Sequence, residues 1–239
     1  MKRLLAAGYE KIFQISRCWR AGERGTLHLA EFTLLEWYRS NSDYRDLMDE
    51  CEALIQSVRP VAGPGDDISF RDRTVRLSSP WERISVGEAF RRFARISMRE
   101  AVERRLFDEV MVREIEPLLG TERPTFIFDY PVERGALARL KRDDPTLTER
   151  FELYLAGIEV ANAFSELTDA KEQRKRFESE EARRRSLNKP PYPVPEKFLT
   201  ELIDMPPSAG IALGVDRLVI LFLDAESVDE VVAFTPEEL

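Results

Sequence analysis

Charged side chains of both signs are concentrated in residues 18–38, CWRAGERGTLHLAEFTLLEWY. Arg20 ends the first apolar run, and His28, the only histidine of the chain, lies in the loop that follows. A guanidinium binds phosphate oxygens through a planar, permanently charged fork. Arg20 and Arg217, which adjoins the glycines of GIALGVDR, could therefore clamp a polyphosphate. Taken singly, an arginine is more often a surface ion-pair partner.

The same segment carries an acid and a phenol that could hold an amine. Alternation puts Phe32, Glu36 and Tyr38 on one face of a strand, with Phe32 and Glu36 separated by roughly 13 Å. An elongated small molecule could lie along this strand. Glu36 and Tyr38 would form a negative, partly aromatic cage for an amine. In the alternative interpretation, Tyr38 belongs only to a half-buried strand.

Further carboxylates are spaced seven residues apart at Glu152, Glu159 and Glu166. Simple alternation puts Glu159 on the opposite face, so a turn or bulge is needed to bring it to Glu152. Converging carboxylates are oxygen ligands of the kind that Mg²⁺ shares with nucleotide phosphates. The alternative is a solvated edge strand whose charges discourage aggregation. Asn162 and Glu166 share parity and would suit a bound ammonium.

Hydrophobic periodicity predicts the elements that must position these residues. Antiparallel strands are expected at 11–20 and 31–38, a strand at 124–131, and a hairpin at 151–164 that turns about residues 156–157. Helices are expected at 44–58, 85–94, 98–119 and 166–187, and a glycine-bearing strand runs into an apolar helix from residue 206. Hairpins interleaved with helices predict an α+β fold, an antiparallel sheet flanked by helices.

Composition limits the class of protein. The chain has 239 residues, of which 43% are hydrophobic, enough for a full core, and we expect one domain over 1–239. A net charge of −8 argues against attraction to nucleic acid or anionic lipid. Cys18 and Cys51 form no zinc or disulfide pattern, which favours a reducing cytoplasm. Apolar runs such as 218–223 are far shorter than the ~20 residues that span a bilayer.

Together these blocks resemble class II aminoacyl-tRNA synthetases of the lysyl type. CWRAGERGTLHLAEFTLLEWY resembles the second motif of that class, and GIALGVDRLVIL resembles the third. FELYLAGIEVANAFSELTDAKEQRKRF is similar to the lysine-specific subgroup over its whole length. The resemblance covers residues 9–38, 124–131, 150–177 and 206–234, and it implies a catalytic domain that uses ATP and Mg²⁺.

The resemblance implies a role for each candidate residue. The catalytic arginines would be Arg20, on the α-phosphate and the amino-acid carboxylate, and Arg217, near the γ-phosphate and adenine. The other implied contacts are Glu23, His28 and Phe32 for ATP, Glu152 and Glu159 for Mg²⁺, Glu36 for the α-amino group, Tyr38, Asn162 and Glu166 for the distal ammonium, and Ala212 near the amino-acid pocket. No residue needs to act as nucleophile, since the substrate carboxylate attacks the α-phosphorus.

Within this family the chain is similar to the small paralogues that attach (R)-β-lysine to a lysine of elongation factor P. The sequence has no room for an N-terminal anticodon domain, its net charge is acidic, and Ala212 stands where tRNA ligases tend to carry glycine. The expected substrates are ATP, lysine or β-lysine, and elongation factor P. One alternative is lysine transfer to tRNA, which needs a basic surface. Another is a catalytically silent paralogue that binds nucleotide or amino acid.

Some positions depart from the family pattern. Gly22 takes the place of a usual glutamate and Glu23 follows it, while Leu29 and Ala30 replace an Asn-Pro pair. The first motif is not recognisable ahead of Arg20. We therefore expect a domain that is incomplete at its N-terminus, as a fragment, a late start or a reduced paralogue. Such a domain would expose a sheet edge and an apolar patch, which predicts an unusual homodimer or aggregation.

Overall fold

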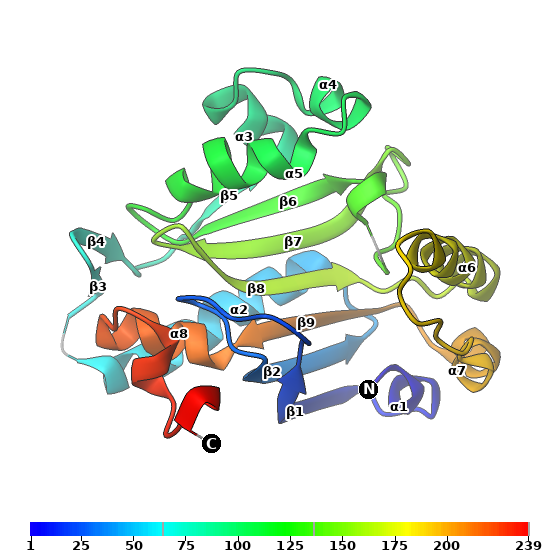
Figure 1. Ribbon diagram of the computed structural model, residues 1–239, viewed down its shortest axis with the longest axis horizontal. Coiled ribbons are helices and arrows are strands. Elements are labelled where there is room, and N and C mark those ends of the chain that lie inside the picture. Colours follow the sequence, from blue (N-terminus) through cyan, green and yellow to red (C-terminus); the bar gives the residue numbers. More distant parts are fainter. Residues whose placement is uncertain (64, 136, 239) are drawn as a thin grey trace.

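One mixed sheet of seven strands organises the chain (Figure 1). The computed structural model describes residues 1–63, 65–135 and 137–238. The strand order is β1-β2-β9-β8-β7-β6-β5, antiparallel throughout except for the parallel pair β5 and β6. The strands are β1 Lys11–Trp19, β2 Glu31–Ser40, β5 Glu82–Ser85, β6 Thr125–Pro131, β7 Leu147–Leu155, β8 Ile158–Ser165 and β9 Ser208–Gly214. The predicted α+β class and mainly antiparallel sheet are confirmed.

Helices cover the sheet unevenly. In Figure 1, α3, α4 and α5 lie over the β5 and β6 end, whereas α6 and α7 stand at the side of the sheet. One face of the sheet is covered by α2 and α8, which share a hydrophobic core with the strands. The helices are α1 Lys2–Ala6, α2 Tyr44–Val58, α3 Val86–Phe93, α4 Met98–Glu103, α5 Phe107–Val110, α6 Ala170–Ser186, α7 Glu196–Glu201 and α8 Val215–Leu223. A small hairpin, β3 Asp67–Phe70 and β4 Arg73–Arg76, borders α8. No helix in the described part of the chain is long and apolar enough to cross a membrane.

Strand alternation separates a core face from an open face. Leu35 and Trp37 of β2 pack toward α2 and α8, together with Ile211 and Leu213 of β9. Because successive side chains of a strand point to opposite faces, Glu36 lies on the other face of the sheet. The apolar core thus fixes which polar residues face the open side.

The start of α2 is fixed by the side chain of Asp43. The Asp43 side chain accepts hydrogen bonds from the backbone N–H groups of Arg45 and Asp46, and the Asp46 side chain accepts from the backbone N–H of Asp43. This reciprocal capping box satisfies N–H groups that have no partner within the helix. The predicted helix over residues 44–58 is confirmed.

The single helix predicted over 98–119 is wrong. The chain forms α4, turns at Arg105, whose φ is +60°, and continues through α5 into a short π-helical and a 3-10 segment. Gly120 ends this region with φ +69°, and a Cβ there would lie 2.3 Å from the Tyr154 carbonyl oxygen. The left-handed turn and the close backbone approach divide an apolar pattern that alone favours one continuous helix.

The helix predicted from residue 166 begins later. Asp169 is the N-cap of α6 and accepts hydrogen bonds from the backbone N–H groups of Lys171 and Glu172. Glu166 remains extended, because its backbone N–H donates to the Ser208 carbonyl of β9. The sheet therefore holds the carboxylate of Glu166 beside β9 instead of releasing it to the exposed surface of a helix.

Candidate active site

The sheet register lines up polar side chains on its open face. Glu36 of β2 pairs with Ala212 of β9, which pairs with Asn162 of β8. Asn162 pairs in turn with Glu152 of β7. Residues directly opposite each other on neighbouring strands lie within side-chain reach. Three sequence blocks that are far apart in the chain therefore form one row across the sheet.

A cavity of about 330 Å³ opens on this face. Eight of the predicted site residues line it, namely Arg20, Glu23, His28, Phe32, Glu159, Asn162, Ala212 and Arg217. Of the remaining four, Glu36 pairs with Ala212 and Glu152 pairs with Asn162, both of which line the cavity. Tyr38 and Glu166 lie further along the sheet, where Tyr38 pairs with Gly210 and the Glu166 N–H donates to the Ser208 carbonyl. The structure thus brings the arginines and the carboxylates of both hairpins together around one space.

The first hairpin places an arginine over an aromatic ring at one end of the cavity. The Arg20 guanidinium carbon lies 5.2 Å from the centroid of the Phe32 ring. Arg20 also lies 3.6 Å from the Glu23 carboxylate, and its side chain is 58% exposed. An exposed guanidinium with a single distant ion-pair partner keeps most of its donors available to a ligand.

Arg217, in the first turn of α8, crosses the cavity to β8. Its Nη1 donates to the Glu159 carbonyl oxygen at 2.7 Å and lies 3.3 Å from the Glu159 carboxylate. Its Nη2 lies 2.6 Å from His28 Nε2. Burial and the nearby Arg217 charge lower the pKa of His28, so the neutral ring can accept this hydrogen bond.

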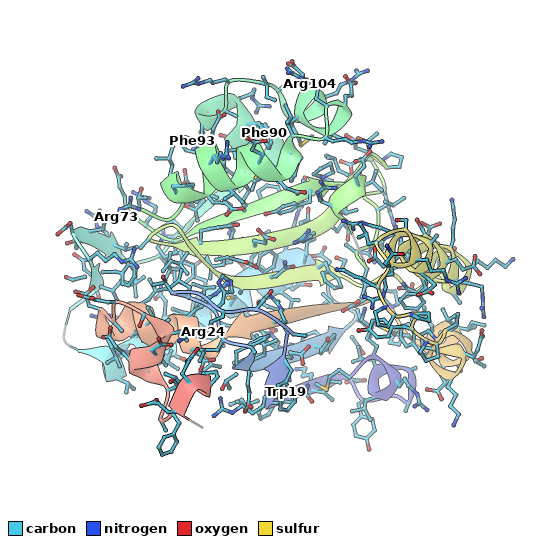
Figure 2. The ribbon with its side chains drawn as sticks, viewed as in Figure 1. Trp19, Arg24, Arg73, Phe90, Phe93 and Arg104 are labelled. Atoms are coloured by element: carbon cyan, nitrogen blue, oxygen red, sulfur yellow. The ribbon has the colours of Figure 1, made fainter. Side chains whose placement is uncertain are left out.

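The loop between β1 and β2 is held by the C-terminal segment. Figure 2 shows Arg24 beside the C-terminal segment that follows α8. Arg24 donates to Asp229 at 2.9 Å and to Glu237 at 2.9 Å, and the Val228 N–H donates to the Thr26 carbonyl at 2.8 Å. No local sequence pattern predicts these contacts, because their partners lie about two hundred residues apart.

Glu152 receives donors from three strands. Its Oε1 accepts from Arg150 Nη2 at 2.5 Å and from Asn162 Nδ2 at 3.1 Å, and its Oε2 accepts from the hydroxyls of Tyr130 at 2.6 Å and Tyr154 at 2.8 Å. Burial raises the pKa of both tyrosines, which keeps them as donors. Arg150, Tyr130 and Tyr154 were missed from the sequence, because short apolar strands gave no reason to single them out.

A β-bulge brings Glu159 to the same face as Glu152. Leu153 pairs with Ala161, but the next residue, Tyr154, pairs with Glu159, so Val160 is the extra residue. The predicted need for an irregularity in this hairpin is confirmed. Burial, followed by the charge of Glu152, raises the pKa of Glu159, whereas Arg217 opposes the shift.

A third carboxylate contributes to this negative region. Burial, followed by the charges of Glu152 and Glu159, raises the pKa of Glu116 to about 7. No group of three or more His, Cys, Asp or Glu residues with metal-holding geometry occurs in the described part of the chain. The donor set nevertheless fits Mg²⁺, which takes one or two protein carboxylates and completes its shell with phosphate oxygens and water. A cation here would relieve the repulsion that raises the pKa of Glu159.

The far end of the row carries two more carboxylates. Glu36 accepts from Gln14 Nε2 at 2.7 Å and from the Tyr38 hydroxyl at 3.3 Å. Glu166 is 1% exposed, and burial raises its pKa to about 7. A Cβ at Gly210 would lie 2.4 Å from Tyr38 Cε1 and 2.6 Å from Glu166 Oε1. The absence of a side chain at Gly210 therefore lets the phenol and the carboxylate converge.

Comparison with protein families gives one match over nearly the whole chain. The family described as tRNA synthetases class II (D, K and N) matches residues 1–238. This match includes both hairpins and the β9–α8 segment, the elements that line the cavity.

Several curated proteins are similar over almost the full chain. An elongation factor P–(R)-β-lysine ligase of Proteus mirabilis (strain HI4320) is 40% identical over 241 residues, which cover 98% of this chain and 74% of that protein. The ligase of the same name from Hamiltonella defensa is 39% identical and covers 99% and 75%. That of Salmonella typhi is 40% identical and covers 98% and 74%.

Proposed function

The chain belongs to the class II tRNA synthetases of the D, K and N type, and from this premise we propose that it is an ATP-dependent ligase that attaches a lysine-type residue to elongation factor P. The observation that carries the proposal is a cavity lined by Arg20, Arg217 and Glu159, beside the row of paired residues that runs from Glu36 to Glu152. Relatives about 40% identical over 98% of the chain are ligases for (R)-β-lysine and elongation factor P.

The arginine end suits a triphosphate. Arg20 would hold the α-phosphate, adenine would stack on Phe32, and Arg217 would lie near the γ-phosphate. The substrate carboxylate attacks the α-phosphorus, pyrophosphate leaves, and a mixed anhydride, the aminoacyl adenylate, forms. Fixed positive charges stabilise the negative charge that spreads over the phosphate oxygens in such a transition state. Positioning both reactants in one cavity removes much of the entropic barrier of a bimolecular step.

Glu159 and Glu152 would hold magnesium at the phosphates. Bound there, Mg²⁺ would supply charge neutralisation and orientation of the pyrophosphate leaving group. Glu152 is already oriented by four donors, so we assign the more adaptable metal contact to Glu159. Arg217, which contacts Glu159, would reorient toward the phosphates when ATP binds.

The carboxylate end suits a diamino acid. Glu36 would pair with the amino group nearer the carboxylate, and Tyr38, Asn162 and Glu166 would surround the distal ammonium. Ala212 lies in the same row as Glu36 and Asn162. Its methyl group restricts the space beside Glu36, which is where α-lysine and β-lysine differ, and we propose that the β-amino acid is preferred.

The acceptor and the assembly complete the proposal. A net charge of −8 disfavours tRNA, whose binding depends on neutralising phosphates. A cytoplasmic location is supported by the two free cysteines, Cys18 and Cys51. A homodimer is supported by the exposed apolar side chains of the edge strand β1, which include Phe13, Ile15 and Trp19. Trp19 is labelled in Figure 2.

ATP–pyrophosphate exchange tests the activation step. We expect exchange with (R)-β-lysine, weaker exchange with α-lysine, and none with alanine. Glu159→Gln should abolish the Mg²⁺-dependent exchange because it removes a charged metal ligand, while far-UV circular dichroism stays unchanged. Arg92→Gln, at a surface ion pair of α3 remote from the cavity, is the matched control and should exchange like the wild type. Absence of exchange with every amino acid, despite a folded protein, would favour a silent binding module.

A further inference from the structure

A lysine of this chain reaches the interior next to Glu166. Lys2 Nζ, from helix α1, lies 2.5 Å from Glu166 Oε2 and 5.3 Å from the centroid of the Phe164 ring. The ammonium itself is shielded from solvent, although the Lys2 side chain is 14% exposed. The chain thus places its own primary ammonium beside the carboxylate that we assign to the distal ammonium of the substrate.

Lys2 lies at the border of the open cavity. Phe164 belongs to the cavity wall, but Glu36, Tyr38 and Glu166 are not among its described lining residues. Lys2 lies over the Phe164 ring, which lines the open space, and its Nζ contacts Glu166 Oε2. A substrate ammonium that pairs with Glu166 Oε2 must therefore take the position that the Lys2 ammonium occupies.

The pair is suited to exchange because its hydrogen bonding is incomplete. Lys2 contacts Glu166 Oε2 at 2.5 Å, whereas Glu166 Oε1 has no hydrogen-bond partner among the described residues. Removing two charges from water offsets much of their attraction unless good hydrogen bonds accompany the pair. A second ammonium with better alignment can compete for Glu166.

Helix α1 need not move for this exchange. Leu5 is fully buried against Leu202 and Met205, which anchors the helix. The four-carbon stem of Lys2 can rotate so that only the ammonium passes into solvent. The geometry therefore allows a side-chain switch on a fixed helix.

We propose that Lys2 is an internal competitor for the amine subsite, paired with Glu166 in the free protein and displaced by the distal ammonium of the amino acid. The inference rests on the proposed function and adds a control of amino-acid affinity at the same site. The competing interpretation is a permanent counter-ion that orients Glu166 and stays in place when the amino acid binds.

Calorimetric titration with (R)-β-lysine and with α-lysine, without ATP, separates the two. Lys2→Met should bind the diamino acid roughly tenfold more tightly than the wild type, because one charged contact no longer has to be broken. Alanine is too short to reach Glu166, so its weak affinity should be unchanged, as should that for ATP. Arg3→Met is the matched control, since Arg3 pairs with Glu201 and is 56% exposed, and it should bind like the wild type.

Equal or weaker binding by a folded Lys2→Met would overturn the inference and leave the ligase proposal standing. Absence of diamine binding by both the wild type and Lys2→Met would instead remove the amine subsite, and the inference with it. Should Lys2→Met fail to unfold cooperatively, Lys2→Gln takes its place, because it removes the charge but keeps a polar tip, and the same gain in affinity is expected.

Discussion

Glu166 combines deep burial with a charge that must be available to a ligand. Its carboxylate is 1% exposed, and its pKa of about 7 arises from burial, with Lys2 lowering and Glu36 raising it. An acid whose folded-state pKa lies above the usual value near 4.5 destabilises the fold as pH rises from about 4.5 to 7, because the unfolded carboxyl ionises more readily. The buried Glu166 carboxylate therefore lowers the stability of the fold in this pH range, while it provides a negative charge that can bind an ammonium.

The affinity for a diamino acid should depend on the protonation of Glu166. A protonated carboxyl must lose its proton before it pairs with an ammonium, so affinity should fall as pH drops below about 7, by up to about tenfold per unit. Calorimetry from pH 5.5 to 8.5 measures this slope. Glu166→Gln should bind weakly with a flatter profile, which separates Glu166 from other groups that titrate here, such as His28 and Glu116. If the diamine affinity of Glu166→Gln changed with pH as steeply as that of the wild type, another group would cause the pH dependence.

Gly210 makes room for the amine subsite. Gly210→Ala should reduce diamine affinity at least about tenfold and destabilise the fold by about 1 to 3 kcal/mol, because the new methyl overlaps Tyr38 and Glu166. Calorimetry and urea unfolding measure the two effects. Gly25→Ala is the control, since a Cβ there meets no atom within 4 Å. Normal diamine binding by Gly210→Ala would show that the ligand does not reach this point.

Among the secondary-structure elements, local patterns predicted the strands well but not the pairing between distant blocks. The two hairpins and the glycine strand follow from alternation and turn residues, including Ala156 and Gly157, which both adopt positive φ. The row from Glu36 to Glu152 also depends on β9 inserting between β2 and β8. No local sequence pattern predicts this strand order. Only the family resemblance predicted that these residues share one site.

Residues 60–120 lie outside the blocks that carried the family resemblance. Their helices are short and separated by a left-handed turn at Arg105, and their parallel strand β5 contacts β6 from a distant part of the sequence. Glu116, which joins the carboxylate region of the site, could not be singled out, because its neighbours Glu152 and Glu159 come from another hairpin.

The α2 cap offers a test of an element that supports the site from behind. Asp43→Ala should lower the free energy of unfolding by about 1 kcal/mol, since it removes the hydrogen bonds to the N–H groups of Arg45 and Asp46. Urea unfolding should show a lower midpoint with an unchanged slope. Diamine affinity should stay near the wild-type value, because α2 packs on the opposite face of the sheet. A large loss of affinity would mean that α2 controls the site directly.

The whole molecule joins a triphosphate-binding end and a diamine-binding end across one sheet face. The first contains Arg20 and Arg217, and the second contains Glu36, Tyr38 and Glu166. The acidic net charge separates this arrangement from a tRNA-binding surface. We therefore expect the activated residue to pass to a protein acceptor.

Intact-mass spectrometry of the acceptor tests that claim most directly. Elongation factor P would be incubated with the protein, ATP, Mg²⁺ and (R)-β-lysine, beside a parallel reaction with tRNA and a control without ATP. We predict that elongation factor P gains the mass of one lysyl-type residue at a single lysine, only when ATP is present, and that tRNA stays uncharged. Unmodified elongation factor P together with aminoacylated tRNA would contradict the account.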